Sequence, residues 1–401
     1  MKNYFKFLLT VIFVLLSNMA NAAQPFITED KNQNVMVLKE KSLGLSFFVN
    51  PNLDSGILRA VNNLQSDFEK VTGQRPRVLN QHPNVSSPLI IIGMIGSNSI
   101  IDDLVKQKKI EGKELKGKNE KFIIQQVKNP FKGVEEALVV AGSDKRGTIY
   151  GIYELSRQIG VSPWYYWADV PVNHKENIYF VKGIYTEGEP AVKYRGIFLN
   201  DEAPALSGWA KATFGGFNSH FYEKVFELIL RLKANYIWPA MWGNAFYDDD
   251  AASGPLANEM GIVMGTSHHE PMALAQTDWR RYIKKNNLPN IWDYSKNKTV
   301  LDEFWKTGIQ RSKNWEKLVT IGMRGDGDEA MSEGTNISLL ENIVKEQRKI
   351  IAKETGKSAD KTPQVWALYK EVQDYYDQGM RVPNDVILLF CDDNWGNVRK
   401  L

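Results

Sequence analysis

The second half of this chain repeats one pattern six times, and this pattern constrains the fold more than any other feature of the sequence. Each time, a short apolar run that predicts a β-strand ends in a cluster of polar or aromatic residues. A stretch with helical periodicity follows each of the first four runs. Strands that alternate with helices are typical of a (β/α) barrel, in which the loops after the strands form the active site. The runs lie at residues 197–199, 236–238, 262–264, 318–321, 365–369 and 386–390.

A separate α/β domain is predicted to precede the barrel, at residues 23–187. Apolar residues recur there at helical spacing between residues 57 and 71, and later apolar runs predict buried strands. A charged, Gly- and Pro-containing stretch near residues 186–190 interrupts the pattern and predicts the domain boundary. Eight strands close a (β/α)8 barrel. We therefore expect residues 188–401 to form an incomplete TIM barrel in which about six strands are present.

The N-terminus has the pattern of a secretory signal peptide. Lys2 and Lys6 flank the start of an apolar stretch at residues 7–16, and an A-x-A triplet at residues 20–22 matches a cleavage site. The apolar stretch is too short to span a bilayer. We therefore expect residues 1–22 to be removed, and we expect a secreted or periplasmic protein without a membrane anchor.

The charge of the chain gives no reason to expect a nucleic-acid partner. Lys and Arg number 50 and Asp and Glu number 47, a formal net charge of +3. Removing Lys2 and Lys6 with the signal peptide leaves 48 − 47 = +1. The sequence also has no basic stripe of the kind that neutralises a phosphate backbone. Nucleic-acid binding is therefore not predicted.

Carboxylates dominate the residues that follow the predicted strands. A single acidic residue on a loop is usually just solvated, but acids follow five of the six runs, and a barrel would bring those positions to one mouth. Acids that crowd together shift one another's pKa values, as an acid/base pair requires. Glycosidases use two such carboxyl groups. The acids are Asp201, Glu202, Asp248, Asp249, Asp250, Glu270, Asp326, Asp328, Glu329, Glu371, Asp392 and Asp393.

Aromatic and basic residues near the same strand ends fit a sugar substrate. Trp238, Trp242 and Trp395 could stack on sugar rings, although a Trp in a barrel more often serves packing. Arg324 lies among glycines, and it either neutralises the surrounding acids or binds an anionic group through its fork of N–H donors. The residues from His268 to Glu270 lack the His spacing of a helical zinc motif. We therefore expect neither a metal nor a cofactor.

Five motifs give the sequence a specific resemblance. Residues 194–202 (YRGIFLNDE), 235–242 (NYIWPAMW), 264–271 (MGTSHHEP) and 322–329 (GMRGDGDE) resemble glycoside hydrolase family 115. These enzymes are xylan α-1,2-glucuronidases, which remove (4-O-methyl-)glucuronic acid side chains from glucuronoxylan with inversion. Residues 143–151 (SDKRGTIYG) are similar to the family's N-terminal domain and to other hexosaminidase-like domains. The resemblance covers nearly the whole mature chain.

The resemblance also implies roles for individual residues. Glu371 matches the general acid, and Asp328 matches a catalytic carboxylate that would orient and deprotonate water. The implied architecture is a hexosaminidase-like α/β domain, a barrel, a helical domain and a β-rich domain, in a full-length form that dimerises and needs no metal. The resemblance implies six substrate-binding residues, and Trp242 is added to them because it could stack on a sugar ring. The expected substrate-binding residues are therefore Asp201, Glu202, Trp242, His269, Arg324, Asp392 and Asn394.

The sequence departs from the family pattern in ending shortly after the sixth strand, so we expect a fragment of a longer glucuronidase. Two alternatives remain open. The first is an inactive or glycan-binding truncated homologue. The second is another hexosaminidase-like glycosidase that acts on a different sugar.

Overall fold

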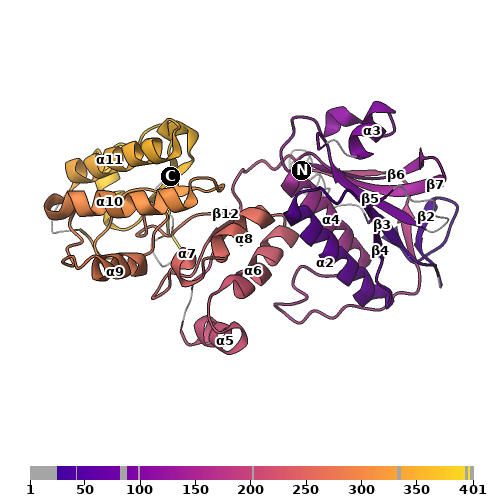
Figure 1. The fold of residues 1–401 in the computed structure, drawn as a ribbon, viewed down its shortest axis with the longest axis horizontal. Coiled ribbons are helices and arrows are strands. Elements are labelled where there is room, and N and C mark those ends of the chain that lie inside the picture. The colour runs from indigo at the N-terminus through magenta and orange to yellow at the C-terminus, as the bar shows by residue number, and fades with distance from the viewer. Residues whose placement is uncertain are drawn as a thin grey trace, which may run out of the picture. The chain divides into compact units, whose positions relative to one another are not determined.

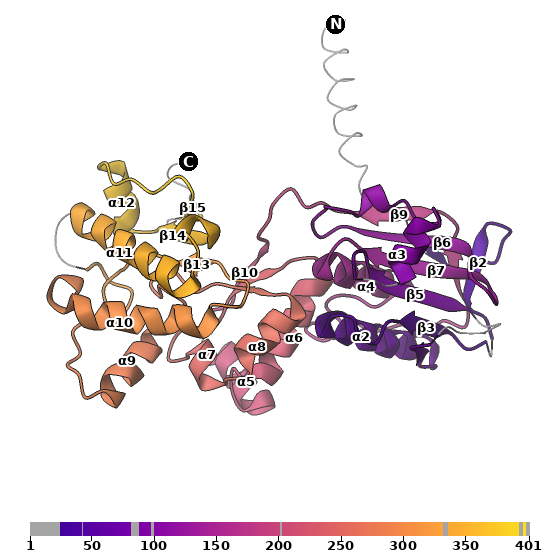
Figure 2. The same ribbon diagram turned by 45° about the horizontal axis from the view of Figure 1, so that its top comes forward.

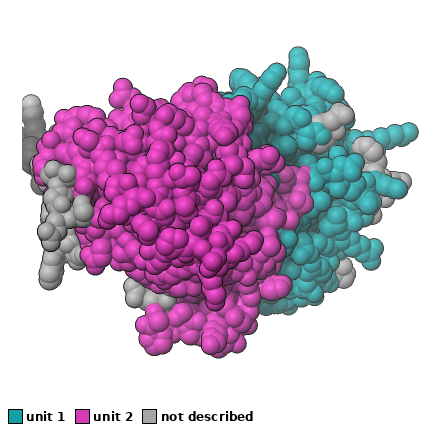
Figure 3. Space-filling view, turned by 60° about the vertical axis from the view of Figure 1, so that its left-hand side comes forward, with its two compact units in different colours: residues 1–53, 57–190 teal, residues 54–56, 191–401 magenta. Residues whose placement is uncertain are grey.

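The computed structural model describes residues 25–41, 43–81, 88–97, 100–200, 203–331, 336–392 and 396–397. The predicted signal peptide and five of the candidate site residues lie outside the described residues: Asp201, Glu202, Asp393, Asn394 and Trp395. The chain divides into two compact units, coloured teal and magenta in Figure 3. The first unit runs to Pro190, apart from residues 54–56, and the second begins at Ala191.

The first unit is built on a six-stranded mixed sheet with the strand order β4-β3-β5-β7-β6-β9. Its first four strands in that order are parallel, and β6 and β9 are antiparallel to their neighbours. A small antiparallel sheet has the order β1-β8-β2. The strands are β1 (Ile27–Thr28), β2 (Val35–Lys39), β3 (Ser46–Val49), β4 (Arg77–Leu79), β5 (Leu89–Met94), β6 (Phe122–Phe131), β7 (Val134–Gly142), β8 (Ile178–Val181) and β9 (Ile184–Glu187).

The apolar residues at helical spacing between residues 57 and 71 lie in the first of two long helices in this unit. Helix α2 (Ser55–Thr72) ends before Gly73, whose φ of 70° terminates it. Helix α4 (Lys145–Ile159) begins where the Asp144 carboxylate accepts a hydrogen bond from the Gly147 N–H at 2.7 Å. The remaining helical elements are α3 (Ile100–Lys106) and the 3₁₀ turn η1 (Gly112–Glu114).

The second unit contains six parallel strands, one in each of the six apolar runs. They form two three-stranded sheets, β10-β11-β12 and β13-β14-β15, and a single parallel bridge between Met264 and Lys317 links them. Every strand thus lies beside its predecessor in the sequence. Among the described residues, however, the sheets do not close into a barrel. The strands are β10 (Gly196–Phe198), β11 (Tyr236–Trp238), β12 (Val263–Met264), β13 (Val319–Thr320), β14 (Gln364–Leu368) and β15 (Ile387–Phe390).

Among the described residues, helices follow five of these strands, one more than the sequence pattern predicts. The segment between β12 and β13 holds two helices, and the helix α12 after β14 is the one that the sequence pattern does not predict (Figures 1 and 2). The helical elements are α5 (Ala205–Phe214), α6 (Ser219–Arg231), α7 (Phe246–Asp249), α8 (Ser253–Met260), α9 (Gln276–Lys285), α10 (Tyr294–Ser312), α11 (Ile337–Thr355), η2 (Ala359–Lys361) and α12 (Glu371–Asp377).

Side chains of β10, β11, β14 and β15, together with Leu318 directly before β13, line an apolar cavity of about 630 Å³. Phe198, Trp238, Leu318, Val365 and Leu389 are among its lining residues. A separate buried cluster packs helices α9, α10 and α11 against β13 and β14. None of the described helices combines the length and the apolar character that crossing a membrane requires.

Candidate active site

The loops after β13 and β14 carry the predicted catalytic residues Asp328 and Glu371, and the loop after β12 carries the predicted substrate-binding residue His269. The β12 loop is tied to its neighbour because the Thr320 hydroxyl donates to the Thr266 carbonyl at 2.5 Å. The Thr266 hydroxyl in turn donates to the Glu270 carbonyl at 2.5 Å. These bonds hold the two intervening histidines, His268 and His269, in a tight turn beside the β13 loop.

The β13 loop is shaped by glycine and by a buried amide. Gly322 has a φ of 98°, and a Cβ there would lie 2.8 Å from Nε1 of Trp366, so only glycine fits. The side chain of Gln347, which is fully buried on α11, accepts from the Gly322 N–H and donates to the Gly322 carbonyl, both at 2.8 Å. This clamp fixes the backbone two residues before Arg324.

Arg324 joins the two predicted catalytic carboxylates. Its Nε and Nη2 donate to the two oxygens of Glu371, both at 2.8 Å. Its Nη1 forms an ion pair with Oδ1 of Asp328. Lys370 adds a second cation, with Nζ 3.6 Å from Oδ2 of Asp328. The Arg324 side chain is only 3% exposed, so these ion pairs are well shielded from water.

Two of these residues have left-handed backbone conformations. Asp328 has a φ of 64°, and Lys370 has φ and ψ of 49° and −125°. Such conformations are costly for residues other than Gly, Asn and Asp, and they gather at functional sites. The turn at Lys370 directs Glu371, the first residue of α12, toward Arg324.

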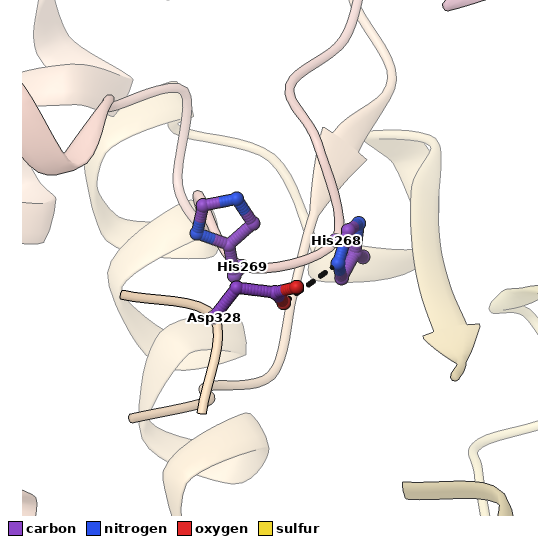
Figure 4. A group of neighbouring side chains, drawn as sticks. All are labelled: His268, His269 and Asp328. Atoms are coloured by element: carbon purple, nitrogen blue, oxygen red, sulfur yellow. Dashed lines mark hydrogen bonds and ion pairs between the residues drawn. The ribbon is translucent and has the colours of Figure 1, made fainter. Parts of the chain in front are cut away.

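His268 extends the cluster and was not among the site residues predicted from the sequence. Its Nε2 lies 2.8 Å from Oδ1 of Asp328 (Figure 4). Burial, with the charges of Arg324 and Lys370 nearby, lowers the pKa of His268 from 6.5 to about 4. The ring is therefore neutral near pH 7. Because an ionised Asp328 can only accept, Nε2 is the ring nitrogen that carries the proton.

Acid should destabilise the protein through these histidines. Burial and the neighbouring His268 lower the pKa of His269 to about 3. The unfolded chain therefore binds more protons than the folded one once the pH falls below about 6.5, and stability declines from there toward about pH 4. For His268 alone the loss amounts to about 3 kcal/mol. We expect His268→Gln to reduce the drop in urea-unfolding free energy between about pH 7 and about pH 4.5.

The matched control for this experiment is His220→Gln, because His220 is exposed on α6. This variant should show the same pH dependence as the parent protein. An unchanged drop in stability for His268→Gln would contradict the assignment of a lowered pKa to that ring.

His269 and Trp242 continue the site away from the carboxylates. His269 is buried and its Nε2 lies 3.2 Å from Sδ of Met241. Its ring centroid is 5.4 Å from that of Trp242, which is 48% exposed. Trp242 also lines a pocket of about 470 Å³, with Ala203, Ser207, Lys211, Gly215, Gly216, Phe217 and Asn244.

The group formed by His268, His269 and Asp328 has the composition of a cation site, but its surroundings oppose one. The three possible ligand atoms lie within 4.8 Å of one another. However, the Asp328 carboxylate is already paired with Arg324 and lies near Lys370. A metal ion would have to approach against both of these cations. The chemistry of the cluster therefore favours acid/base work over metal binding.

Several acids that the sequence pattern directed to the same mouth have structural roles instead. Asp248 and Asp249 form ion pairs with Arg281. Asp250 accepts hydrogen bonds from backbone N–H groups at the starts of α6 and α8. Glu270 is buried and accepts from the Gln276 N–H at 3.3 Å. The expectation that all these acids converge is therefore wrong.

The remaining predicted residues divide between packing and solvent. Trp238 is only 6% exposed and its indole N–H donates to the hydroxyl of Tyr236, so it packs inside the second unit. Asp326 pairs with Arg280 at 3.5 Å on the surface. Asp392 follows β15 and is exposed. The structure thus brings together Arg324, Asp328 and Glu371, with His269 close by.

Sequence reasoning missed the contributions of His268, Lys370 and Gln347. The first two had a usable signal, because each is adjacent in sequence to a predicted site residue at a strand end. Gln347 had none, since it lies 25 residues after the glycine that it clamps.

Comparisons with known proteins find matches to two glycosyl hydrolase families. The family model of glycosyl hydrolase family 115 matches residues 187–401, and that of the N-terminus of glycosyl hydrolase family 67 matches residues 32–155. A search of curated proteins finds no match. Among solved structures, a family 115 4-O-methyl-α-glucuronidase with specificity for decorated arabinogalactans is 33% identical, with a TM-score of 0.78.

The alignment with that enzyme covers 91% of this chain and 47% of the other, so the chain spans about half of its relative's length. A Streptomyces plicatus β-hexosaminidase is 12% identical with a TM-score of 0.49, over 89% of this chain and 72% of the other.

The stronger matches put the chain among the glycoside hydrolases. Because the family model covers more than half of its 401 residues, the chain belongs to glycoside hydrolase family 115.

Proposed function

We propose that the full-length protein removes (4-O-methyl-)glucuronic acid side chains from glucuronoxylan by an inverting mechanism. The observation that carries the proposal is the pair of carboxylates, Asp328 and Glu371, held on opposite sides of one buried guanidinium. Family membership supports the same reaction class. A secreted or periplasmic location, proposed from the N-terminal signal pattern, would suit a polymeric substrate.

The proposed chemistry assigns one proton transfer to each carboxyl group. Glu371, once protonated, gives its proton to the glycosidic oxygen as the bond to the anomeric carbon breaks. Asp328 accepts a proton from the water that attacks the opposite face of that carbon. Inversion requires the two carboxyl groups to be roughly 6.5–9.5 Å apart to leave room for this water. The guanidinium of Arg324 between them acts as a spacer in the resting arrangement.

A second substrate is favoured by a specific observation. The similar family 115 enzyme is described as specific for decorated arabinogalactans. The uronic acid would be the same and only the polymer that carries it would differ. The pocket beside Trp242 is where we propose that this polymer binds, because it combines an exposed indole with polar side chains.

We also propose that strands β10 to β15 are six strands of a (β/α)8 barrel. Two observations support this proposal. Successive parallel strands lie side by side, and side chains of the first two and the last two strands line a shared apolar cavity. Small barrels fill their interior with layers of side chains. Further strands would be needed to fill the cavity described here.

The test of the proposed function is ¹H NMR of the full-length protein with glucuronoxylan and with a glucuronic acid-decorated arabinogalactan. We expect free uronic acid to form from at least one polymer, with the β-anomer appearing first and mutarotation following. Initial release of the α-anomer would refute inversion. Binding of either polymer without release would favour a glycan-binding homologue. Cleavage of hexosaminides alone would favour the other glycosidase.

Trp242 should contribute to binding the polymer more than to the chemical step. We expect Trp242→Ala to raise KM for the polymer about ten-fold, the equivalent of 1.4 kcal/mol, with a smaller change in kcat. Trp164→Ala is the matched control, because Trp164 is similarly exposed at 45% but lies in the first unit. Equal effects of the two substitutions would show that Trp242 has no special role in binding.

A further inference from the structure

In the resting structure, Glu371 cannot act as a general acid. Both of its carboxylate oxygens accept hydrogen bonds from Arg324, from Nε and Nη2 at 2.8 Å each. A guanidinium has only donors, so an oxygen that faces it carries no proton. A carboxyl group that must protonate a leaving oxygen first has to leave this bidentate pair and gain a proton.

The guanidinium that holds Glu371 is also well suited to the anionic part of the proposed substrate. A bidentate Arg–carboxylate pair depends on the planar fork, which a uronic acid carboxylate matches as well as a glutamate does. Arg324 is buried and its other nitrogen already pairs with Asp328. An incoming carboxylate that engages the fork therefore has to compete with Glu371.

We propose that the substrate's uronic acid carboxylate replaces Glu371 on Arg324, and that Glu371 thereby becomes protonated and competent as the general acid. This inference rests on the proposed function, and it explains why the substrate of that function has to carry a carboxylate. Arg324 is then the specificity-determining residue, because it exchanges one carboxylate for another.

The charge balance of the cluster supports this exchange. The charged groups beside Glu371 and Arg324 are Asp328 and Lys370. The titratable groups that complete the surroundings are the rings of His268, His269 and Tyr369. Arg324 and Lys370 balance Asp328 and Glu371 in the resting state. A bound uronate adds one negative charge to this buried group, and the uptake of one proton by Glu371 restores neutrality. Crowded carboxylates favour protonation of one of them for the same reason.

The exchange would also exclude neutral sugars. A glucoside has a hydroxymethyl group where the uronide has its carboxylate, so it has no anion with which to displace Glu371. Arg324 then keeps Glu371 ionised, and the leaving oxygen receives no proton. Discrimination would act on the chemical step as well as on binding.

Isothermal titration calorimetry in buffers of different ionisation enthalpy tests the exchange. With the full-length protein at about pH 6, glucuronic acid should bind with the uptake of about one proton per molecule. Glu371→Gln should bind glucuronic acid without that uptake. The control Glu303→Gln alters an exposed acid on α10 and should behave like the parent. Glucose, which has no carboxylate, should cause no proton uptake in the same titration.

Two calorimetric results would overturn the exchange: glucuronic acid binding without proton uptake in the parent protein, or uptake that persists in Glu371→Gln. Either could occur while uronic acid is still released from a polymer, so the proposed function would stand. Absence of both binding and release would refute the two proposals together. A crystal structure with glucuronic acid that retains both Arg324–Glu371 bonds would refute the exchange alone.

Discussion

Replacing Glu371 with Gln should reduce the release of uronic acid about 10³-fold or more, because the amide cannot protonate the leaving oxygen. Gln has nearly the same shape, so the loop and α12 should keep their conformation. The measurement is the initial rate of uronic acid release from the preferred polymer, with the melting temperature recorded for each variant.

The control for this variant is again Glu303→Gln, which changes the charge by the same amount at a surface position that is 59% exposed. It should keep the parent rate. Activity of Glu371→Gln within ten-fold of the parent would rule out Glu371 as the general acid. The same rate measurement would then be repeated on Asp328 variants to decide whether the roles are reversed.

Asp328→Asn should reduce the same rate by about 10²- to 10⁴-fold, because Asn cannot take a proton from the attacking water. Asn is the best available replacement, since it tolerates the left-handed conformation that Asp328 adopts at a φ of 64°. The backbone of the β13 loop should therefore survive the substitution, and the lost rate can be attributed to the carboxylate.

The matched control is Asp326→Asn, two residues away in the same loop. Asp326 is 42% exposed and pairs with Arg280 at the surface. Its substitution should leave the rate nearly unchanged. If the two variants lost activity equally, the effect would belong to the loop as a whole and not to Asp328.

Much of the second unit could be predicted because its signals are local. Each of the six apolar runs overlaps a strand, and helices follow the first four runs as the helical periodicity there predicts. Helix α12 was missed because it has only 7 residues and begins directly at a polar site residue, Glu371. Short helices depend on tertiary contacts more than on periodicity.

The candidate site was less predictable because ion pairing joins residues that are far apart in sequence. Nothing local indicates that Asp248 is neutralised by Arg281, so it was grouped with the catalytic acids. For Arg324, the sequence left two roles equally open. The structure shows Arg324 paired with two acids at rest. Binding of an anionic substrate group remains a prediction.

The backbone at Lys370 has a consequence for any effort to make this protein more heat-resistant. A residue with a side chain in that conformation costs roughly 1–3 kcal/mol, so Lys370→Gly would relieve unfavourable backbone energy. The substitution would also remove a cation near Asp328 and make the backbone turn that positions Glu371 more flexible. A screen that selects on melting temperature alone would therefore tend to accept this substitution, and the selected variant would have a lower catalytic rate.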